Sequence, residues 1–304
     1  MDRRGGRRST GEMKNLIVNA DDLGWTTGVN RGIAEAHRSG IVTSTSLLAN
    51  GVAFDDGVNV SRALPALGVG VHLNLSDGAP VNHARKVPSL VDAHGKLSGG
   101  PEQLLLKLAR RKLKLGEVEV EWEAQIEKIR AAGISPTHLD GHKHVHMLPG
   151  LFSIALKLAK KHGIGSIRIS SEASSLRAAL SGKSGRDAGV KLKQGIQARA
   201  LKLLSGDARK LADQTGIEAA DFFCGIAQTG VLSRDGVLEL LGALPEGTTE
   251  LMCHPGYVDD DLVASSTRLQ ASRATELEIL TDAAVRKSVA SHGIRLINYS
   301  QIAN

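Results

Sequence analysis

Short apolar runs that alternate with helical segments constrain the fold of this 304-residue chain more than any other feature. Such runs, each leading through polar residues into a helix, are typical of parallel strands joined by crossover helices. We expect strands at residues 16–19, 41–50, 68–75, 137–141, 166–170, 222–227, 248–253 and 294–298. We expect helices at residues 27–38, 53–64, 102–115, 118–132, 149–162, 233–241 and 268–291. The alternation predicts an α/β fold built on a parallel sheet.

The kind of α/β fold follows from the motifs that are missing. No GxGxxG follows the first predicted strand and no GxxxxGK[ST] occurs, which disfavours an open nucleotide-binding sheet. A closed or nearly closed (β/α) barrel is the better prediction. We expect one catalytic domain over residues 14–304, with residues 172–220 as a helical insertion because no clear strand occurs there.

The composition narrows the class of protein. Apolar residues make up 41% of the chain, enough for a sizeable core, and aromatic residues only 3%. No run of about 18 apolar residues occurs, so we expect no transmembrane helix. Cys224 and Cys253 are far apart and fit no disulfide framework, which favours the cytoplasm.

The net charge of +6 is concentrated in two stretches. Residues 1–13 carry four arginines without an apolar segment behind them, so we expect a disordered basic arm or a mis-annotated start, with translation beginning at Met13. Residues 177–210 are also basic. Because no aromatics interleave these charges, a solvated helical insertion is favoured over nucleic-acid binding. Peripheral contact with an anionic membrane stays open for this stretch.

The residues most suggestive of chemistry fall within residues 137–146. Five metal-ligating or acid–base side chains stand at even positions: His138, Asp140, His142, His144 and His146. In an extended segment all five could point to one face. A hydrophobic core cannot bury such a set unpaired, and imidazole is the commonest protein metal ligand. The stretch therefore predicts a metal or acid–base site at the end of a strand.

Further polar side chains stand at the predicted ends of other strands. Asp21 and Asp22 end the first strand, His72 lies in the third, and His254 follows the strand at 248–253. A helix cap would explain one aspartate, but adjacent carboxylates are better explained by a cation between them or by one carboxylate held protonated. Because catalytic residues of (β/α) barrels lie at the carboxyl ends of the strands, these side chains should lie close together.

One aspartate and two histidines from different strands can bind a metal and leave open positions. With Zn²⁺, such a site lowers the pKa of bound water, and a spare carboxylate can act as general base. The set suits hydrolysis of an amide or ester. A non-haem iron oxygenase uses similar ligands but would leave the second aspartate unexplained, and a two-metal phosphoesterase usually needs more carboxylates.

The motifs taken together resemble those of the YdjC/ChbG family of carbohydrate deacetylases, from about residue 14 to residue 304. The matching segments are NADDLG at 19–24, IVTST at 41–45, GVHL at 70–73, HLDGHKHVH at 138–146 and CHPG at 253–256. The resemblance implies a distorted (β/α) TIM-like barrel and removal of the acetyl group from N-acetylated sugars, chitooligosaccharides among them.

The resemblance also implies roles for individual residues. It makes Asp22, His72 and His142 the metal ligands, Asp21 the general base, and His254 the general acid or the group that holds the oxyanion. His144 and His146 then fall to substrate or supporting roles, Asp140 could orient a histidine, and Trp25 could line the sugar pocket or belong to the core. The family is linked with Mg²⁺, whereas two imidazoles suit Zn²⁺ or another transition metal better.

The partner expected from the resemblance is an N-acetylated sugar or glycolipid. One branch of the family is tied to hopanoid lipid synthesis and would act on an N-acetylglucosaminyl lipid. No nucleic acid is expected as a partner, and a homodimer stays open. A non-catalytic sugar- or lipid-binding protein on the same barrel, or a hydrolase of another amide or ester, is the alternative function.

Overall fold

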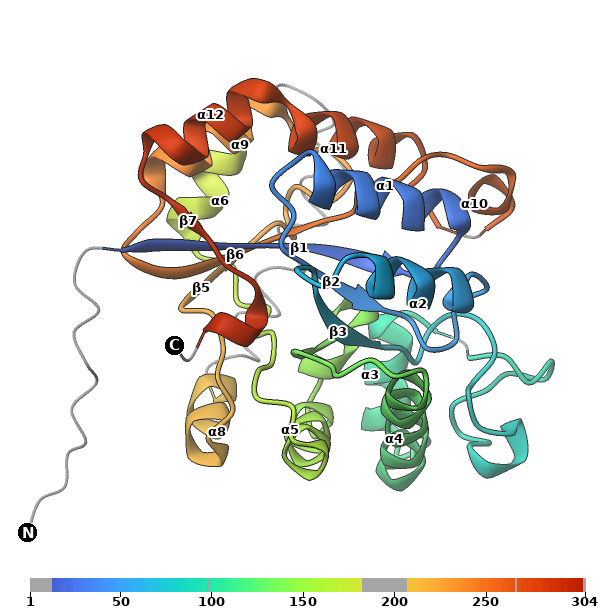
Figure 1. The fold of residues 1–304 in the computed structure, drawn as a ribbon. Coiled ribbons are helices and arrows are strands. Elements are labelled where there is room, and N and C mark those ends of the chain that lie inside the picture. Colours follow the sequence, from blue (N-terminus) through green and yellow to red (C-terminus); the bar gives the residue numbers. More distant parts are fainter. Residues whose placement is uncertain (1–12, 98, 182–206, 266, 303–304) are drawn as a thin grey trace, which may run out of the picture.

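The computed structural model describes residues 13–97, 99–181, 207–265 and 267–302 (Figure 1). The strands are β1 (Lys14–Leu23), β2 (Ser44–Leu47), β3 (Gly68–Leu73), β4 (Leu139–Gly141), β5 (Phe222–Cys224), β6 (Gly247–Cys253) and β7 (Arg295–Leu296). The α-helices are α1 (Thr27–Arg38), α2 (Phe54–Ala63), α3 (Pro101–Ala109), α4 (Leu115–Ala131), α5 (Leu151–His162), α6 (Ser174–Ser181), α8 (Ala208–Thr215), α9 (Arg234–Ala243), α10 (Asp260–Ala264), α11 (Ala271–Thr281) and α12 (Ala283–Ser291). The 3₁₀ helices are η1 (Ala84–Lys86), η2 (His142–Met147) and η3 (Tyr299–Gln301).

All strand pairs in the sheet are parallel, in the order β4-β3-β2-β1-β6-β5, and β7 pairs with the beginning of β1. Residues 166–173 connect the two ends of this sheet. The amide of Arg168 donates to the carbonyl of Leu139 at 2.9 Å, and the amide of Ala173 donates to the carbonyl of Phe223 at 3.1 Å. These bonds link β4 to β5, which confirms the predicted distorted TIM-like barrel. The strand predicted at 166–170 forms only isolated bridges, because its backbone pairs with several partners in turn.

Helices lie on both sides of the strands (Figure 1), with α1, α9, α11 and α12 on one side and α4, α5 and α8 on the other. From Leu16 to Leu23 every residue of β1 is buried, as expected for a central strand with both faces covered. The apolar side chains of the strands and the inner helix faces form one large core. This core fixes the carboxyl ends of the strands, where the polar side chains are found.

Two helix predictions were wrong in their bounds. The single helix expected at 268–291 is interrupted at Asp282, whose ψ of 132° ends α11. The Oδ1 of Asp282 accepts hydrogen bonds from the amides of Ala284 and Val285 at 2.6 and 3.2 Å, so it caps the start of α12. The helix expected to begin at Pro149 begins at Leu151 instead, after the left-handed Gly150.

The two basic stretches lie largely outside the described residues: residues 1–12 of the predicted arm, and residues 182–206 of the stretch at 177–210. The described parts of the insertion form α6 and α8. Among the described residues, no helix combines the length and the apolar character needed to cross a bilayer.

Gly70 on β3 provides a test of how closely the barrel interior is packed. A Cβ at this position would lie 2.4 Å from the His138 ring, which stacks on Tyr299 with ring centroids 3.8 Å apart. We expect Gly70→Ala to lower the free energy of unfolding by about 1–3 kcal/mol in urea denaturation. Gly116→Ala, where a Cβ meets nothing within 4 Å, should leave stability unchanged or higher; equal effects of the two substitutions would contradict this packing.

Candidate metal centre and active site

Two adjacent carboxylates approach the same histidine because the backbone of β1 changes at its end. Asp22 has a φ of 74°, a left-handed conformation that a non-glycine residue rarely adopts. In a regular strand Asp21 and Asp22 would point to opposite faces. Here Oδ2 of Asp21 and Oδ1 of Asp22 lie 4.0 and 3.5 Å from Nε2 of His72. Such strained residues occur at functional sites when their surroundings hold them.

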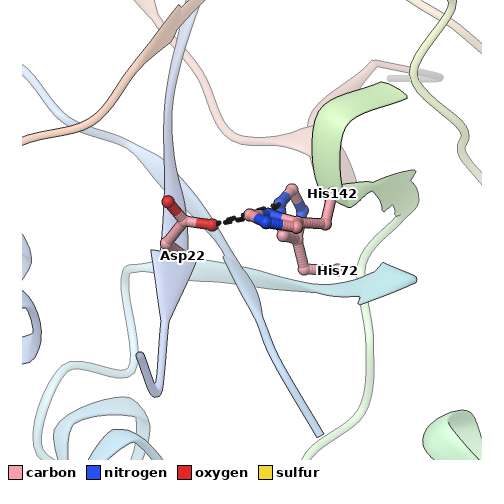
Figure 2. A group of neighbouring side chains, drawn as sticks. All are labelled: Asp22, His72 and His142. Atoms are coloured by element: carbon pink, nitrogen blue, oxygen red, sulfur yellow. Dashed lines mark hydrogen bonds and ion pairs between the residues drawn. The ribbon is translucent and has the colours of Figure 1, made fainter. Parts of the chain in front are cut away.

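Asp22, His72 and His142 form a compact buried triangle (Figure 2). Nδ1 of His142 lies 3.0 Å from Oδ1 of Asp22 and 3.3 Å from Nε2 of His72. Despite these neighbours, Oδ1 of Asp22 accepts no hydrogen bond among the described residues. Three ligand atoms bonded at about 2.0–2.1 Å to one tetrahedral metal would lie roughly 3.3 Å apart. The triangle therefore has the size and donor types of a site that could bind a divalent metal.

His72 presents Nε2 to this triangle because its other nitrogen is occupied. Nδ1 of His72 lies 2.7 Å from Oδ1 of Asp140. A carboxylate on the second nitrogen fixes the tautomer of a metal-binding imidazole. Burial alone would lower the pKa of His72, but the carboxylates of Asp140, Asp22 and Asp21 raise it to about 10. The surroundings thus favour positive charge at this position, which a proton or a metal cation can supply.

A fully buried arginine, Arg168, holds the carboxylates behind the triangle. Its guanidinium makes two hydrogen bonds of 2.7 Å with the carboxylate of Asp21 and one of 2.8 Å with Glu250, and it lies 2.9 Å from Asp140. Burial alone would raise the pKa of Asp21, but Arg168 keeps it below its usual value. The hydroxyl of Tyr299 donates to the far oxygen of Glu250. Asp21 is therefore ionised and fixed in orientation.

A second group, Asp21, His72 and Asp140, also has its ligand atoms close enough together for a metal. The guanidinium of Arg168 already lies against both of these carboxylates. A divalent cation there would be repelled by the arginine, so the triangle of Asp22, His72 and His142 is the better site.

Helix α11 supports the other side of the site through two residues one turn apart. Arg273 donates to Oδ2 of Asp22 at 2.5 Å, and the carboxylate of Glu276 accepts the amide of His254 at 2.6 Å. His254 follows β6 and is 8% exposed, and its Nδ1 has no hydrogen-bond partner among the described residues. Burial lowers the pKa of His254 to about 4, against the opposing effect of Asp21 and Asp22, so the imidazole is neutral at pH 7.

The strand predicted at 137–141 ends at Gly141, as β4 does, and the chain beyond it is not extended: η2 begins at His142, and Lys143 and His144 have φ values of 53° and 58°, so the five side chains do not share one face. His144 turns away from the triangle, and its Nδ1 lies 2.9 Å from the hydroxyl of Ser170. His146 donates from Nε2 to the carbonyl of Arg168 at 3.1 Å. Neither residue belongs to the metal triangle; His146 supports the backbone of Arg168 from behind.

A cavity of about 670 Å³ lies beside the triangle. The half-buried Trp25 lines this cavity and packs on His142, with ring centroids 5.2 Å apart. Asp77, Asn50 and Asn74 also line it. The cavity thus adjoins the candidate ligand His142 through Trp25 and Asp77, and it has an aromatic ring and polar groups on its wall, as expected of a small-molecule site.

Four residues of the site were not predicted from the sequence: Arg168, Arg273, Glu250 and Asp77. Arg168 and Glu250 had a usable signal, because each is a lone charge inside a predicted buried strand and must therefore be paired. Arg273 is one of several charged residues on a long helix, and Asp77 lies in a polar loop. Nothing in the sequence distinguishes these two from ordinary surface residues.

Comparisons with known proteins identify the family of this chain. The chain matches the model of the YdjC-like protein family over residues 15–291. It is 32% identical over 289 residues to a carbohydrate deacetylase of Thermoanaerobacter pseudethanolicus, covering 95% of this chain and 99% of that protein. It is 34% identical over 286 residues to a chitooligosaccharide deacetylase of Salmonella paratyphi B, covering 92% and 96%. The chain belongs to the YdjC-like family.

A solved structure supports the fold. The crystal structure of an Enterococcus faecalis protein, described as a candidate cellobiose-phosphate cleavage protein, is 30% identical in sequence to this chain. It superposes with a TM-score of 0.76 and covers 96% of this chain and 99% of that one.

Metal affinity should depend steeply on pH. With a pKa of about 10, His72 is protonated at pH 7, so a metal that binds its Nε2 must displace that proton. Between pH 8 and pH 6, which lie below this pKa, each unit by which the pH falls should weaken zinc binding about tenfold, because the proton competes with the metal. Calorimetric titrations between pH 6 and 8 can measure this, and a dissociation constant that does not change with pH would contradict it.

Proposed function

We propose that this protein is a metal-dependent hydrolase that removes the acetyl group from N-acetylated sugars. The observation that carries the proposal is the triangle of Asp22, His72 and His142, which has the ionised Asp21 beside it and adjoins a cavity through Trp25. The names of the similar proteins, carbohydrate deacetylase and chitooligosaccharide deacetylase, support the same class of reaction.

The three triangle residues are the proposed ligands of a divalent metal. When bound, the metal would polarise the acetyl carbonyl and lower the pKa of a water molecule beside it. The two imidazoles suit Zn²⁺ or another transition metal, whereas family resemblance suggests Mg²⁺. Arg273 neutralises the oxygen of Asp22 that faces away from the triangle, so one carboxylate oxygen stays directed at His72 and His142.

Asp21 is the proposed general base. Its pairing with Arg168 keeps it ionised, and Asn19 donates a further hydrogen bond to it at 2.8 Å. Fixed in this way, Asp21 can take a proton from the attacking water and pass it to the departing amine nitrogen. The low pKa makes Asp21 a weak base, so it depends on the metal to make the water acidic.

His254 is the proposed donor to the oxyanion that forms on the acetyl carbonyl. A neutral imidazole carries one N–H, and its low pKa keeps it neutral at pH 7. The lowered pKa favours this role over that of a general acid, for which the side chain would have to be protonated beforehand. The hydrogen bond from its amide to Glu276 fixes the backbone from which the ring projects.

The cavity beside Trp25 is the proposed sugar site. Trp25 presents an aromatic ring beside His142 on which a sugar ring could pack, and Asn50 and Asn74 hold the backbone of Asp77 on the same wall. An oligosaccharide containing N-acetylglucosamine, or the sugar of a glycolipid, would place its acetamido group at the metal. We further propose that residues 14–304 form a single catalytic domain and that residues 172–220 are an insertion in it.

Acetate release provides the test of this function. Metal-stripped protein supplied with Zn²⁺, Co²⁺ or Mg²⁺ should release acetate from N-acetylglucosamine oligomers or from an N-acetylglucosaminyl lipid. Asp21→Asn should keep the metal but lower kcat by about 10²- to 10⁴-fold, because it removes the base. Asp92→Asn, which changes an exposed aspartate that does not line the cavity, is the matched control and should leave kcat unchanged.

Two results would contradict the proposal. Acetate release that persists in Asp21→Asn would show that Asp21 is not the general base. Tight binding of sugar or lipid without acetate release, with metal bound, would favour the alternative of a non-catalytic binding protein. Release of a different acid from another amide or ester would show that the protein is a hydrolase but that the proposed substrate is wrong.

A further inference from the structure

We infer that Asp77, on the wall of the cavity, is a positioning residue that orients His142 for metal binding. This inference rests on the proposed metal site. His142 directs Nδ1 at Asp22 and His72, so Nε2 points the other way. That nitrogen lies 3.3 Å from Oδ2 of Asp77. With Nδ1 bonded to a metal, Nε2 carries the hydrogen, and Asp77 is the carboxylate within reach to accept it.

Asp77 is itself held in place by its neighbours. Its carbonyl accepts hydrogen bonds from the side-chain amides of Asn50 and Asn74, both at 2.8 Å. Its amide donates to Oδ1 of Asn74 at 3.2 Å, and the hydroxyl of Ser76 donates to Oδ2 at 2.7 Å. A side chain fixed at both its backbone and its carboxylate can fix the imidazole it contacts.

Lys143 completes the arrangement. Its left-handed backbone, with a φ of 53°, follows His142 directly and allows Nζ to lie 2.5 Å from Oδ2 of Asp77. The ammonium group of Lys143 therefore lies against the same Asp77 oxygen that faces Nε2 of His142 and helps to hold that carboxylate in place.

The two histidines thus have carboxylates in corresponding positions, although only His72 makes a short hydrogen bond, at 2.7 Å; Nε2 of His142 lies 3.3 Å from Asp77 and makes no hydrogen bond among the described residues. Asp140 contacts Nδ1 of His72, and Asp77 contacts Nε2 of His142, in each case the nitrogen away from the triangle. The two carboxylates differ in burial, because the Asp140 side chain is 0% exposed and the Asp77 side chain 19%. Asp77 therefore lines the cavity and also contacts the proposed metal ligand His142. A sugar in the cavity would lie against the carboxylate that orients His142.

The test is the zinc affinity of the metal-stripped full-length protein, measured by calorimetry. Asp77→Ala should raise the zinc Kd by roughly 10- to 100-fold, the usual effect of removing such a partner. Asp77→Asn keeps an acceptor but loses the charge, so its Kd should lie between those of Asp77→Ala and the unaltered protein. Asp55→Ala, which changes a carboxylate elsewhere on the same cavity wall, should stay within about twofold.

Melting temperatures of the metal-free variants separate positioning from simple stability. The inference is overturned if Asp77→Ala lowers the melting temperature but binds zinc as tightly as the unaltered protein. It is supported if Kd rises in the order expected while the metal-free melting temperatures stay alike. If the unaltered protein binds no zinc, Co²⁺ or Mg²⁺, the proposed metal site fails as well, which is distinguishable from failure of Asp77 alone.

Discussion

The buried contact between Arg168 and the carboxylates of Asp21, Asp140 and Glu250 is the interaction on which the site depends. These acids come from β1, β4 and β6, so one guanidinium joins three parts of the barrel. A single positive charge does not balance three carboxylates: burial raises the pKa of Glu250 to about 7, although Arg168 opposes the shift, and the pKa of His72 is raised to about 10. The negative charge that Arg168 does not balance lies beside the triangle, where a metal cation would neutralise it.

The backbone at the end of β1 determines which partner each of the two adjacent carboxylates contacts. The left-handed Asp22 allows consecutive carboxylates to serve different partners, Asp21 with Arg168 and Asp22 with the histidines. Arg273 of α11 holds Asp22 in that conformation from outside the barrel. A base and a metal ligand can therefore be adjacent in sequence and still be held apart by separate cations.

Much of this arrangement could be predicted from sequence, and the reasons for the failures are physical. The alternation of strands and helices predicted the barrel, and the position of Asp22, His72 and His142 at strand ends predicted that they would meet. The left-handed residues after Gly141 could not be predicted, because tertiary contacts such as that between Lys143 and Asp77 hold them. The break at Asp282 was missed because its capping role interrupts an otherwise helical pattern.

X-ray absorption at the metal edge of the zinc- or cobalt-loaded protein tests the central claim most directly. Our account predicts scattering from two imidazoles and one carboxylate oxygen at about 2.0–2.2 Å. His72→Ala should remove one imidazole from this shell, whereas His144→Ala should leave it unchanged because His144 lies against Ser170. A metal shell with no imidazole, or one that loses an imidazole in His144→Ala, would contradict the assignment of the triangle as the metal centre.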